Sequence, residues 1–278
     1  MEAAVFNRPT IEGLKGDLLS YLRSMLDEIC EKIAEKYGVY DASGRARKAY
    51  VLDTLTQYTC PCCAAKALTQ MRHPEVDTIF RECHDLAVTL LIQALRNMSK
   101  SCLAVDGEVS CEYGRLDVLV RRLNGGLLQV KAGDKELIVE VKTNTGLRVK
   151  QALRYLVERP EATAVIWRVR KRQILVIDGK KHRWLLAIYV AIALHQGLTV
   201  LKEDFMVCNH NLTDSSFEPK DPQGFLDDFL TSLAEGLPKI VNAVLQLLGA
   251  RIENNAKSAL VDVQFESGAC LKDWAREN

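Results

Sequence analysis

The sequence lacks a run of apolar residues long enough to cross a bilayer, and it has almost no net charge. Its most apolar run, Trp184 to Leu194, is about half the length of a membrane-spanning helix. The first residues also lack the charged segment followed by an apolar segment that marks a secretory signal. We therefore expect a soluble, cytoplasmic protein with no membrane partner. With a formal net charge of +1, any basic surface for nucleic acid must be local.

Internal repeats and low-complexity tracts are absent from the sequence as well. The 278 residues, 48% of them hydrophobic, describe an ordinary globular chain that can bury a large core. Apolar spacing predicts helices over 10–37, 48–68 (interrupted by TCPCC), 77–98, 147–157, 184–196 and 225–248. Asp77 is the expected N-cap of the third of these helices. Gly197 is expected to stop the fifth, and Gly236 to Pro238 to break the sixth.

Strands are predicted where apolar residues alternate or form short β-rich runs. They cover 114–120, 127–130, 137–142, 163–169 and 173–177. A loop is expected over 209–223, and an attached strand and short helix over 259–278. The order predicts an α/β domain with a mixed central β-sheet of roughly five strands flanked by helices. The expected parts are an N-terminal helical region (1–58), a core (59–200) and a C-terminal, mainly helical extension (201–278).

Three charged residues interrupt these apolar strands. Asp117 lies in LDVLV, and Glu140 and Lys142 lie in IVEVK. Glu140 and Lys142 are two residues apart, so their side chains leave the same face of a strand. If the two strands are neighbours, Asp117 reaches that face too, and two adjacent carboxylates need a cation. Hard oxygen ligands favour Mg²⁺ or Mn²⁺.

The lysine completes a set of groups suited to phosphodiester hydrolysis. An ammonium group holds an attacking water or stabilises the charge that develops on a transferring phosphoryl group. A divalent ion neutralises phosphate and leaving oxygen. The alternative interpretation is that Glu140 and Lys142 form a simple ion pair on an exposed sheet face.

These motifs resemble the PD-(D/E)xK nuclease superfamily. The resemblance rests on GRLD, on EVK 23 positions after the aspartate, and on the Gln151 to Tyr155 segment QALRY. Leu116 stands where many members have proline. The Q-x-x-x-Y pattern is similar to that of RecB-type nucleases, including the CRISPR-associated ones. The resemblance implies a restriction-endonuclease-like core over about residues 60–185, and catalytic-site roles for Gln151 and Tyr155.

The resemblance also implies a histidine ligand on the helix before the aspartate strand. His84, within Glu82-Cys83-His84-Asp85, occupies that position. A metal set of His84, Asp117 and Glu140 is therefore expected, with Glu82 and Asp85 as nearby substitutes. A packed or surface histidine is the alternative interpretation.

The nine cysteines are many for an intracellular chain, and an odd number cannot all pair in disulfides. Iron–sulfur members of the family have one upstream cysteine and three near the C-terminus. Here Cys60 has the upstream place, but the C-terminal trio is missing. The expected cofactor site, an iron–sulfur cluster or Zn²⁺, therefore draws on Cys60, Cys62, Cys63 and Cys208, with Cys83 as a further ligand. Buried thiols are the alternative.

A local basic surface is expected next to the catalytic strands. The residues expected to contact DNA are Arg148, Lys150, Arg154, Arg168, Arg170, Lys171 and Arg172. Trp167 or Trp184 is expected to stack a base. A solvated charged face is the alternative interpretation.

The leading hypothesis is a Mg²⁺- or Mn²⁺-dependent DNA nuclease of RecB-like type that acts on single strands or ends. Two alternatives remain: a sequence- or structure-specific endonuclease of the same superfamily, and a nucleic-acid-binding or assembly protein that does not cleave. The helical extensions leave open whether the chain forms a homo-oligomer or holds another partner.

Overall fold

The computed structural model forms two compact units. It describes residues 17–70, 78–99, 103–123, 135–143, 149–202 and 219–249. The first unit combines Met1–Arg72 with His182–Leu212, and the second combines His73–Lys181 with Thr213–Asn278. This division differs from the expected one, because the last part of the expected core belongs with the N-terminal helices.

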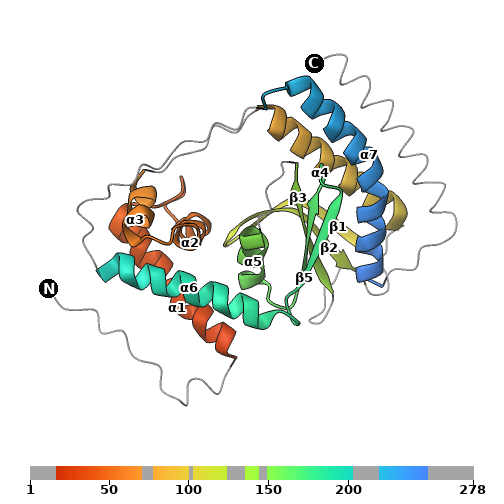
Figure 1. The fold of residues 1–278 in the computed structure, drawn as a ribbon. Helices are drawn as coiled ribbons and strands as arrows, with labels where there is room; N and C mark the ends of the chain where they lie inside the picture. The colour runs from red at the N-terminus through yellow and green to blue at the C-terminus, as the bar shows by residue number, and fades with distance from the viewer. Residues whose placement is uncertain are drawn as a thin grey trace. The chain divides into compact units, whose positions relative to one another are not determined.

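The first unit is helical, with α1 (Leu18–Tyr37), α2 (Lys48–Gln57), α3 (Pro61–Thr69) and α6 (Arg183–Lys202) (Figure 1). The Asp17 carboxylate caps α1 by accepting the Leu19 N–H at 3.1 Å. Gly38, with φ +66°, ends α1 in the left-handed conformation that glycine adopts without strain. The predicted interruption between α2 and α3 is confirmed, and Pro61 begins α3.

Helix α6 continues through Gly197, so the prediction that this glycine stops the helix is wrong. A Cβ atom at Gly197 would lie 2.5 Å from Cγ2 of Ile29 on α1 and 3.3 Å from Cδ1 of Leu55 on α2. The glycine therefore permits close packing of α6 against α1 and α2. That tertiary requirement outweighs the modest cost of glycine inside a helix.

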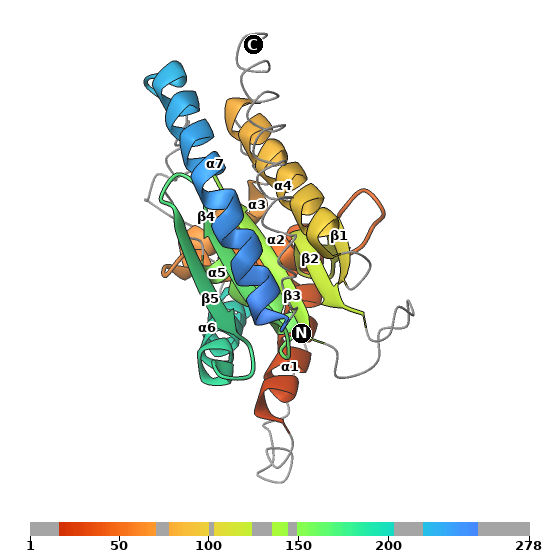
Figure 2. The ribbon, with the colours of Figure 1, turned by 90° about the vertical axis from the view of Figure 1, so that its right-hand side faces the viewer.

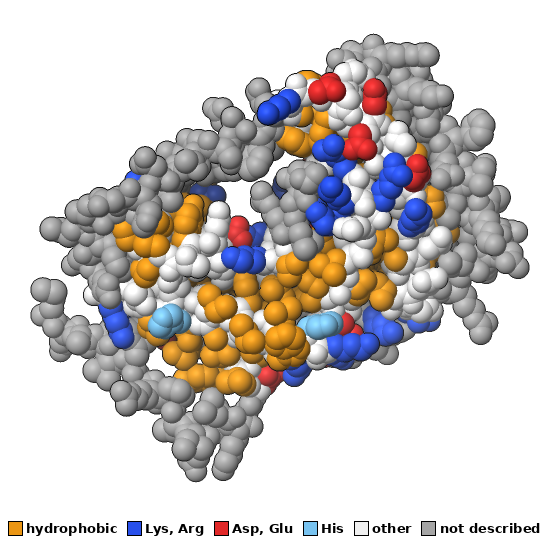
Figure 3. All heavy atoms as spheres, in the orientation of Figure 1, with side chains coloured by type: hydrophobic (Ala, Val, Ile, Leu, Met, Phe, Trp, Pro, Cys, Tyr) orange, Lys and Arg blue, Asp and Glu red, His pale blue; other side chains and the backbone are white. Residues whose placement is uncertain are grey.

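Helix α6 is also long and apolar enough to cross a membrane, by length and composition alone. The expectation from the shorter run Trp184 to Leu194 underestimated its length. A core helix of a soluble protein passes the same test. Residues Trp184, Ile188 and Ile192 are exposed and spaced four apart along α6. Apolar side chains gather on the face of the molecule over α6 (Figure 3).

The second unit is built on a five-stranded mixed β-sheet, in agreement with the predicted α/β class. Its strands are β1 (Leu103–Cys111), β2 (Gly114–Arg122), β3 (Glu136–Lys142), β4 (Thr163–Arg168) and β5 (Gln173–Asp178). Their spatial order follows the sequence. All neighbours are antiparallel except β3 and β4, which are parallel and joined through α5 (Val149–Glu158).

The first strand of the sheet, β1, was not predicted. Its outer half, from Asp106 to Cys111, has only exposed and partly exposed positions and contains Gly107. An edge strand of this kind carries little of the apolar signal on which prediction depends. The strand expected at 127–130 lies outside the described residues, as do Asp77 and the elements expected over 259–278.

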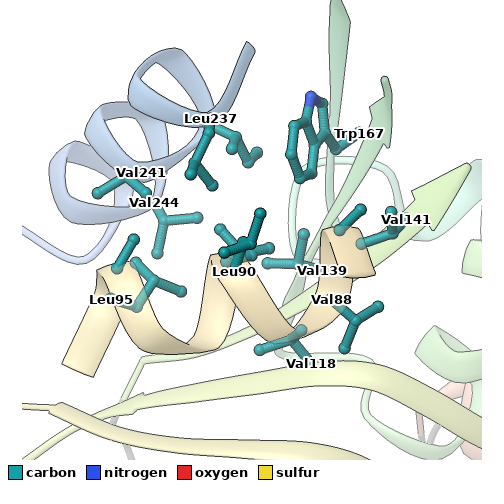
Figure 4. Close-up of a cluster of buried hydrophobic side chains, with 14 of the residues drawn as sticks. Val88, Leu90, Leu95, Val118, Val139, Val141, Trp167, Leu237, Val241 and Val244 are labelled. Atoms are coloured by element: carbon teal, nitrogen blue, oxygen red, sulfur yellow. The ribbon is translucent and has the colours of Figure 1, made fainter. Parts of the chain in front are cut away.

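Helices cover both faces of the sheet. Helix α5 lies on one side, and α4 (Thr78–Ser99) and α7 (Pro222–Leu247) lie together on the other (Figures 1 and 2). The core between α4, α7 and the sheet is formed by side chains that include Val139, Val141 and Trp167 (Figure 4). These alternate along the strands with residues on the α5 side.

Helix α7 runs without the predicted break. Pro238 lies inside it, and Gly236 faces the Trp167 indole, where a Cβ atom would lie 3.2 Å from Nε1. The buried apolar face of α7, which includes Leu237 and Val241, packs in the core that α7 shares with α4 and the sheet (Figure 4). This packing keeps the helix continuous at a sequence that locally favours a break.

Candidate active site

Asp117 lies where β2 and β3 stop pairing. The ladder between these strands ends at Val118 opposite Val139, so Asp117 lies one residue beyond the last pair on β2 and Glu140 one residue beyond it on β3. The Val141 N–H donates to Oδ2 of Asp117 at 2.7 Å. The Asp117 side chain therefore accepts a hydrogen bond from the backbone of β3 at the point where the two strands separate. This hydrogen bond holds the Asp117 carboxylate against β3.

Glu140 and Lys142 leave the same face of β3, as predicted, and their side chains form an ion pair. Glu140 is only 1% exposed and Lys142 is 12% exposed. One oxygen of Glu140, Oε1, accepts from Lys142. The other, Oε2, is buried and has no hydrogen-bond partner among the described atoms. The pair is therefore not the exposed surface pair of the alternative interpretation.

His84 reaches the site from α4. Its Nε2 lies 3.2 Å from Oδ2 of Asp117, and its Nδ1 lies 3.4 Å from Oδ1 of Asp85. The side-chain exposure of His84 is 27% and that of Asp117 is 14%. Exposure thus rises from Glu140 through Asp117 to His84, so solvent reaches the site on the His84 side.

The environment separates the pKa values of the two carboxyl groups. Burial raises the pKa of Glu140 to about 7, and the charge of Asp117 adds to this effect against that of Lys142. Burial also disfavours the charged form of Asp117, but His84, Lys142 and the Val141 N–H together outweigh it and lower the pKa of Asp117. Burial acts against protonation of His84 as well, yet its hydrogen bond to Asp117 raises its pKa. Such a separation is typical of active sites.

The donor atoms of this site are of the chemical types that bind divalent metal ions. Glu140 Oε2 is a buried carboxylate oxygen without a hydrogen-bond partner among the described atoms, and the charge of Asp117 acts on the same carboxyl group. Imidazole nitrogen and carboxylate oxygen are suitable ligands for Mn²⁺, and carboxylate oxygen for Mg²⁺. Among the described residues, however, no three His, Cys, Asp or Glu side chains are already grouped closely enough to hold an ion. His84 and Lys142 instead contact the two carboxylates.

Gln151 and Tyr155 lie one turn apart on α5 and form a network with β2. The Gln151 amide donates to the Tyr155 hydroxyl at 2.9 Å, and that hydroxyl donates to the Arg115 carbonyl at 2.7 Å. Tyr155 is 1% exposed, and burial raises its pKa. The Tyr155 hydroxyl is therefore hydrogen-bonded within the protein, to a residue that lies two positions before Asp117 in the sequence.

The predicted DNA-contacting residues fall into different environments. Arg154 is buried and its guanidinium lies over the Tyr155 ring at 5.2 Å, which argues against direct contact with DNA. Lys150 is exposed on α5. Arg168 pairs in register with Lys142 across the parallel strands β3 and β4, so the two side chains share a face of the sheet. Arg148 lies outside the described residues.

The turn between β4 and β5 is tied to α7. Arg170 forms an ion pair with Asp228 at 2.6 Å and lies over the Phe225 ring at 4.5 Å. Arg172 forms an ion pair with Glu235 at 2.9 Å. Lys171, between them, is exposed. The acidic residues of α7 therefore neutralise much of the basic turn, a feature that only the folded chain reveals.

Two other predictions concern side chains away from this site. Trp167 is fully buried and lies next to Leu237 (Figure 4) and close to Gly236, so the expectation that it stacks a base is wrong. Trp184 is exposed on the helical unit. Cys60 precedes α3, with Cys62 and Cys63 in its first turn. Cys83 is on α4 of the other unit, and Cys208 lies outside the described residues. The cluster therefore stays a prediction.

Sequence reasoning did not single out Arg115 or Glu158 as part of the site. The Arg115 backbone carbonyl accepts from Tyr155, and the Glu158 carboxylate accepts the Glu112 N–H at 2.8 Å. Backbone acceptors leave no signal in residue identity, and an acidic residue at a helix end is usually interpreted as a solvated surface charge.

Comparison of the chain with protein-family models, curated proteins and solved structures finds no match.

Proposed function

We propose that this protein is a metal-dependent deoxyribonuclease with a restriction-endonuclease-like core. The observation that carries the proposal is the arrangement of Asp117, Glu140 and Lys142. Two carboxylates from adjoining strands each lie one residue beyond the last pair of the β2–β3 ladder. Glu140 has a buried oxygen without a hydrogen-bond partner among the described atoms, and its other oxygen forms an ion pair with Lys142. Burial of these charged groups lowers the stability of the fold, and a catalytic role best explains why they are present.

The roles of the residues follow from their environments. Asp117 and Glu140, with His84, would hold Mg²⁺ or Mn²⁺, which neutralises charge on the phosphate and the leaving oxygen when bound. Lys142 presents a buried ammonium group on the same face and stabilises negative charge on a scissile phosphate. Arg168, in register with Lys142 on β4, extends the positive charge along the strand ends.

DNA is the proposed substrate, with single strands and ends as the preferred forms. Lys150, Arg168 and Lys171 supply positive charge on α5, β4 and the β4–β5 turn of the same unit. Their number is small in a chain of net charge +1. Binding is therefore expected to depend on few phosphate contacts and to weaken with salt accordingly.

The test is a cleavage assay on single-stranded, duplex and branched DNA with Mg²⁺ or Mn²⁺. Wild-type protein should cleave at least one substrate, and Lys142→Ala should reduce the rate by about 10²–10³-fold because a charge-stabilising group is lost. Glu140→Gln should act similarly, whereas Glu136→Gln should not. Glu136 is the matched control, since it lies on the same strand four residues away and forms an ion pair with Arg159. Binding without cleavage would instead favour a non-catalytic DNA-binding protein.

A further inference from the structure

The hairpin between β1 and β2 directly precedes Asp117 in the sequence. Cys111 pairs with Gly114, so only Glu112 and Tyr113 form its tip. Tyr113 is fully buried although it lies at the tip of a hairpin. Gly114 has φ +141°, a backbone conformation that favours glycine. This tip is therefore packed against the protein, not a free surface turn.

Helix α5 contacts this hairpin at three successive points. The Glu158 carboxylate accepts the Glu112 N–H at 2.8 Å. A Cβ atom at Gly114 would lie 3.2 Å from Nη2 of Arg154 and 3.0 Å from Cε1 of Tyr155. The Tyr155 hydroxyl donates to the Arg115 carbonyl at 2.7 Å. Side chains from two turns of one helix thus contact residues 112–115.

The same helix is also attached to β3. Arg159, just beyond the end of α5, forms hydrogen bonds to both carboxylate oxygens of Glu136 at 2.9 and 3.0 Å. The strand that carries Glu140 and the hairpin that leads to Asp117 are therefore both attached to one element. The β2–β3 ladder does not extend past Val118 opposite Val139. Contacts from α5 reach the hairpin at Glu112 and Arg115, beyond the last pair of this ladder.

We propose that α5 is a clamp that sets the position of Asp117 relative to Glu140 through the β1–β2 hairpin. Tyr155 and Glu158 are positioning residues, which act on the Arg115 carbonyl and the Glu112 amide and not on the substrate. This inference rests on the proposed nuclease function, because it assigns to α5 the spacing of the two carboxylates. Tyr155, which was expected to be catalytic, is on this proposal a residue that supports the catalytic residues.

The clamp is tested first by kinetics of full-length variants. Tyr155→Phe removes only the hydroxyl, and Glu158→Ala removes the acceptor of the Glu112 N–H. Each should lower kcat by about tenfold or more and raise the half-saturating Mn²⁺ concentration, since small displacements of a catalytic group are costly. KM for DNA should stay within about twofold of wild type, because neither residue contacts substrate. Glu158→Gln keeps an acceptor oxygen and should restore most of kcat.

A second measurement reads the position of Asp117 without any activity. The Val141 N–H is bonded to the Asp117 carboxylate, so its hydrogen exchange reports whether that carboxylate stays in place. Exchange of this amide, followed by NMR, should accelerate by about tenfold in Tyr155→Phe and Glu158→Ala. It should not accelerate in Glu136→Gln, whose side chain keeps an acceptor oxygen for Arg159 and which leaves the hairpin contacts intact. Amides of the α4–α7 core should exchange equally in all three.

The possible outcomes separate the two proposals. Normal kcat and normal Val141 exchange in folded Tyr155→Phe and Glu158→Ala would overturn the clamp while the nuclease function stands. A rise in KM with unchanged kcat would also overturn it, because Tyr155 would then act by binding DNA. If the wild type cleaves no DNA, the proposed function fails. Faster Val141 exchange in the two variants would still show that α5 positions Asp117.

Discussion

At the scale of single residues, Glu140 is the least exposed charged residue among the described residues of the sheet. Its carboxylate is 1% exposed, and only one of its oxygens has a hydrogen-bond partner among the described atoms. Desolvation penalises the charged form more than Lys142 compensates, and the charge of Asp117 adds to the penalty. The residue therefore lowers the stability of the protein whenever it is ionised without a further cation.

This environment predicts the pH dependence of metal-free protein. The pKa of Glu140 is raised to about 7, so the folded state binds more protons than the unfolded state between the ordinary glutamate pKa and 7. The unfolding free energy should therefore fall as pH rises through this range. The raised pKa of His84 acts in the same direction, because its contribution is lost as pH rises through the folded pKa. Glu140→Gln should remove about 1–3 kcal/mol of this fall, measured by urea unfolding between pH 5 and 8.5.

Two observations serve as controls for that prediction. Asp117 has a lowered pKa, so its contribution is present above the ordinary aspartate pKa and is lost only at acidic pH. Glu136→Gln should leave the slope between pH 5 and 8.5 unchanged. A wild-type stability that stays flat or rises across this range would contradict the assigned environment of Glu140.

The residues of the site could be predicted because charges inside apolar strands are visible in the sequence. Asp117, Glu140 and Lys142 stand out against Val, Ile and Leu neighbours, and the two-residue spacing in β3 fixes a common face. The contacts of Arg154, Glu158 and the Arg115 carbonyl could not be predicted. They depend on where α5 meets the β1–β2 hairpin, which no local pattern encodes.

At the scale of elements, long periodic helices and apolar strands were predicted well, whereas glycine and proline positions misled. Gly197 and Pro238 both lie inside helices. Local propensity predicts a stop at each, but packing against Ile29 in one case and against the sheet core in the other keeps the helix continuous. The edge strand β1 was missed because its exposed half has little apolar character.

The packing at Gly197 makes a prediction about α6. Gly197→Ala gains helix propensity but places a methyl group 2.5 Å from Cγ2 of the buried Ile29. The steric cost of the added methyl group should exceed the gain in helix propensity, and the helical unit should lose about 1–3 kcal/mol of stability. Chemical denaturation measures the loss. In the background Ile29→Ala the same substitution should cost less, because the clashing atoms are gone. Equal costs in both backgrounds would show that the contact with Ile29 is not the cause.

The β4–β5 turn allows anchoring and DNA binding to be separated. Arg170 contacts Asp228 and Phe225 of α7, whereas Lys171 is exposed. Lys171→Ala should lower the salt dependence of DNA binding by about one counterion and leave stability unchanged. Arg170→Ala should lower stability by about 0.5–1 kcal/mol with little effect on the salt slope. Titrations at several salt concentrations, together with urea unfolding, measure both effects. The reverse pattern would show that Arg170 is the DNA contact.

At the scale of the whole molecule, every described residue of the proposed catalytic set belongs to one compact unit. His84, Asp117, Glu140, Lys142 and the α5 clamp all lie within His73–Lys181. The helical unit is formed from two separate stretches of the chain. A division of this kind is hard to predict from sequence, because it requires that the last helix of the expected core join the N-terminal helices.

This division predicts independent responses of the two units. Gly197→Ala should lower the unfolding temperature of the helical unit and leave kcat unchanged at temperatures where that unit is folded. Trp167→Ala, which removes a buried side chain between the sheet and α7, should destabilise the catalytic unit by about 3–5 kcal/mol. Calorimetry should resolve which transition shifts in each variant. A shift of the same single transition in both would show that the units unfold together.

The central claim is that Asp117, Glu140 and Lys142 form a metal-dependent nuclease site. The most direct measurement is Mn²⁺-dependent cleavage of single-stranded and duplex DNA by wild type, Asp117→Asn, Lys142→Ala and Glu136→Gln, each shown to be folded by circular dichroism. We predict cleavage by wild type and Glu136→Gln that EDTA abolishes, and a loss of on the order of a hundredfold or more in the other two. Undiminished cleavage by Asp117→Asn and Lys142→Ala, or no cleavage by the folded wild type, would contradict the account.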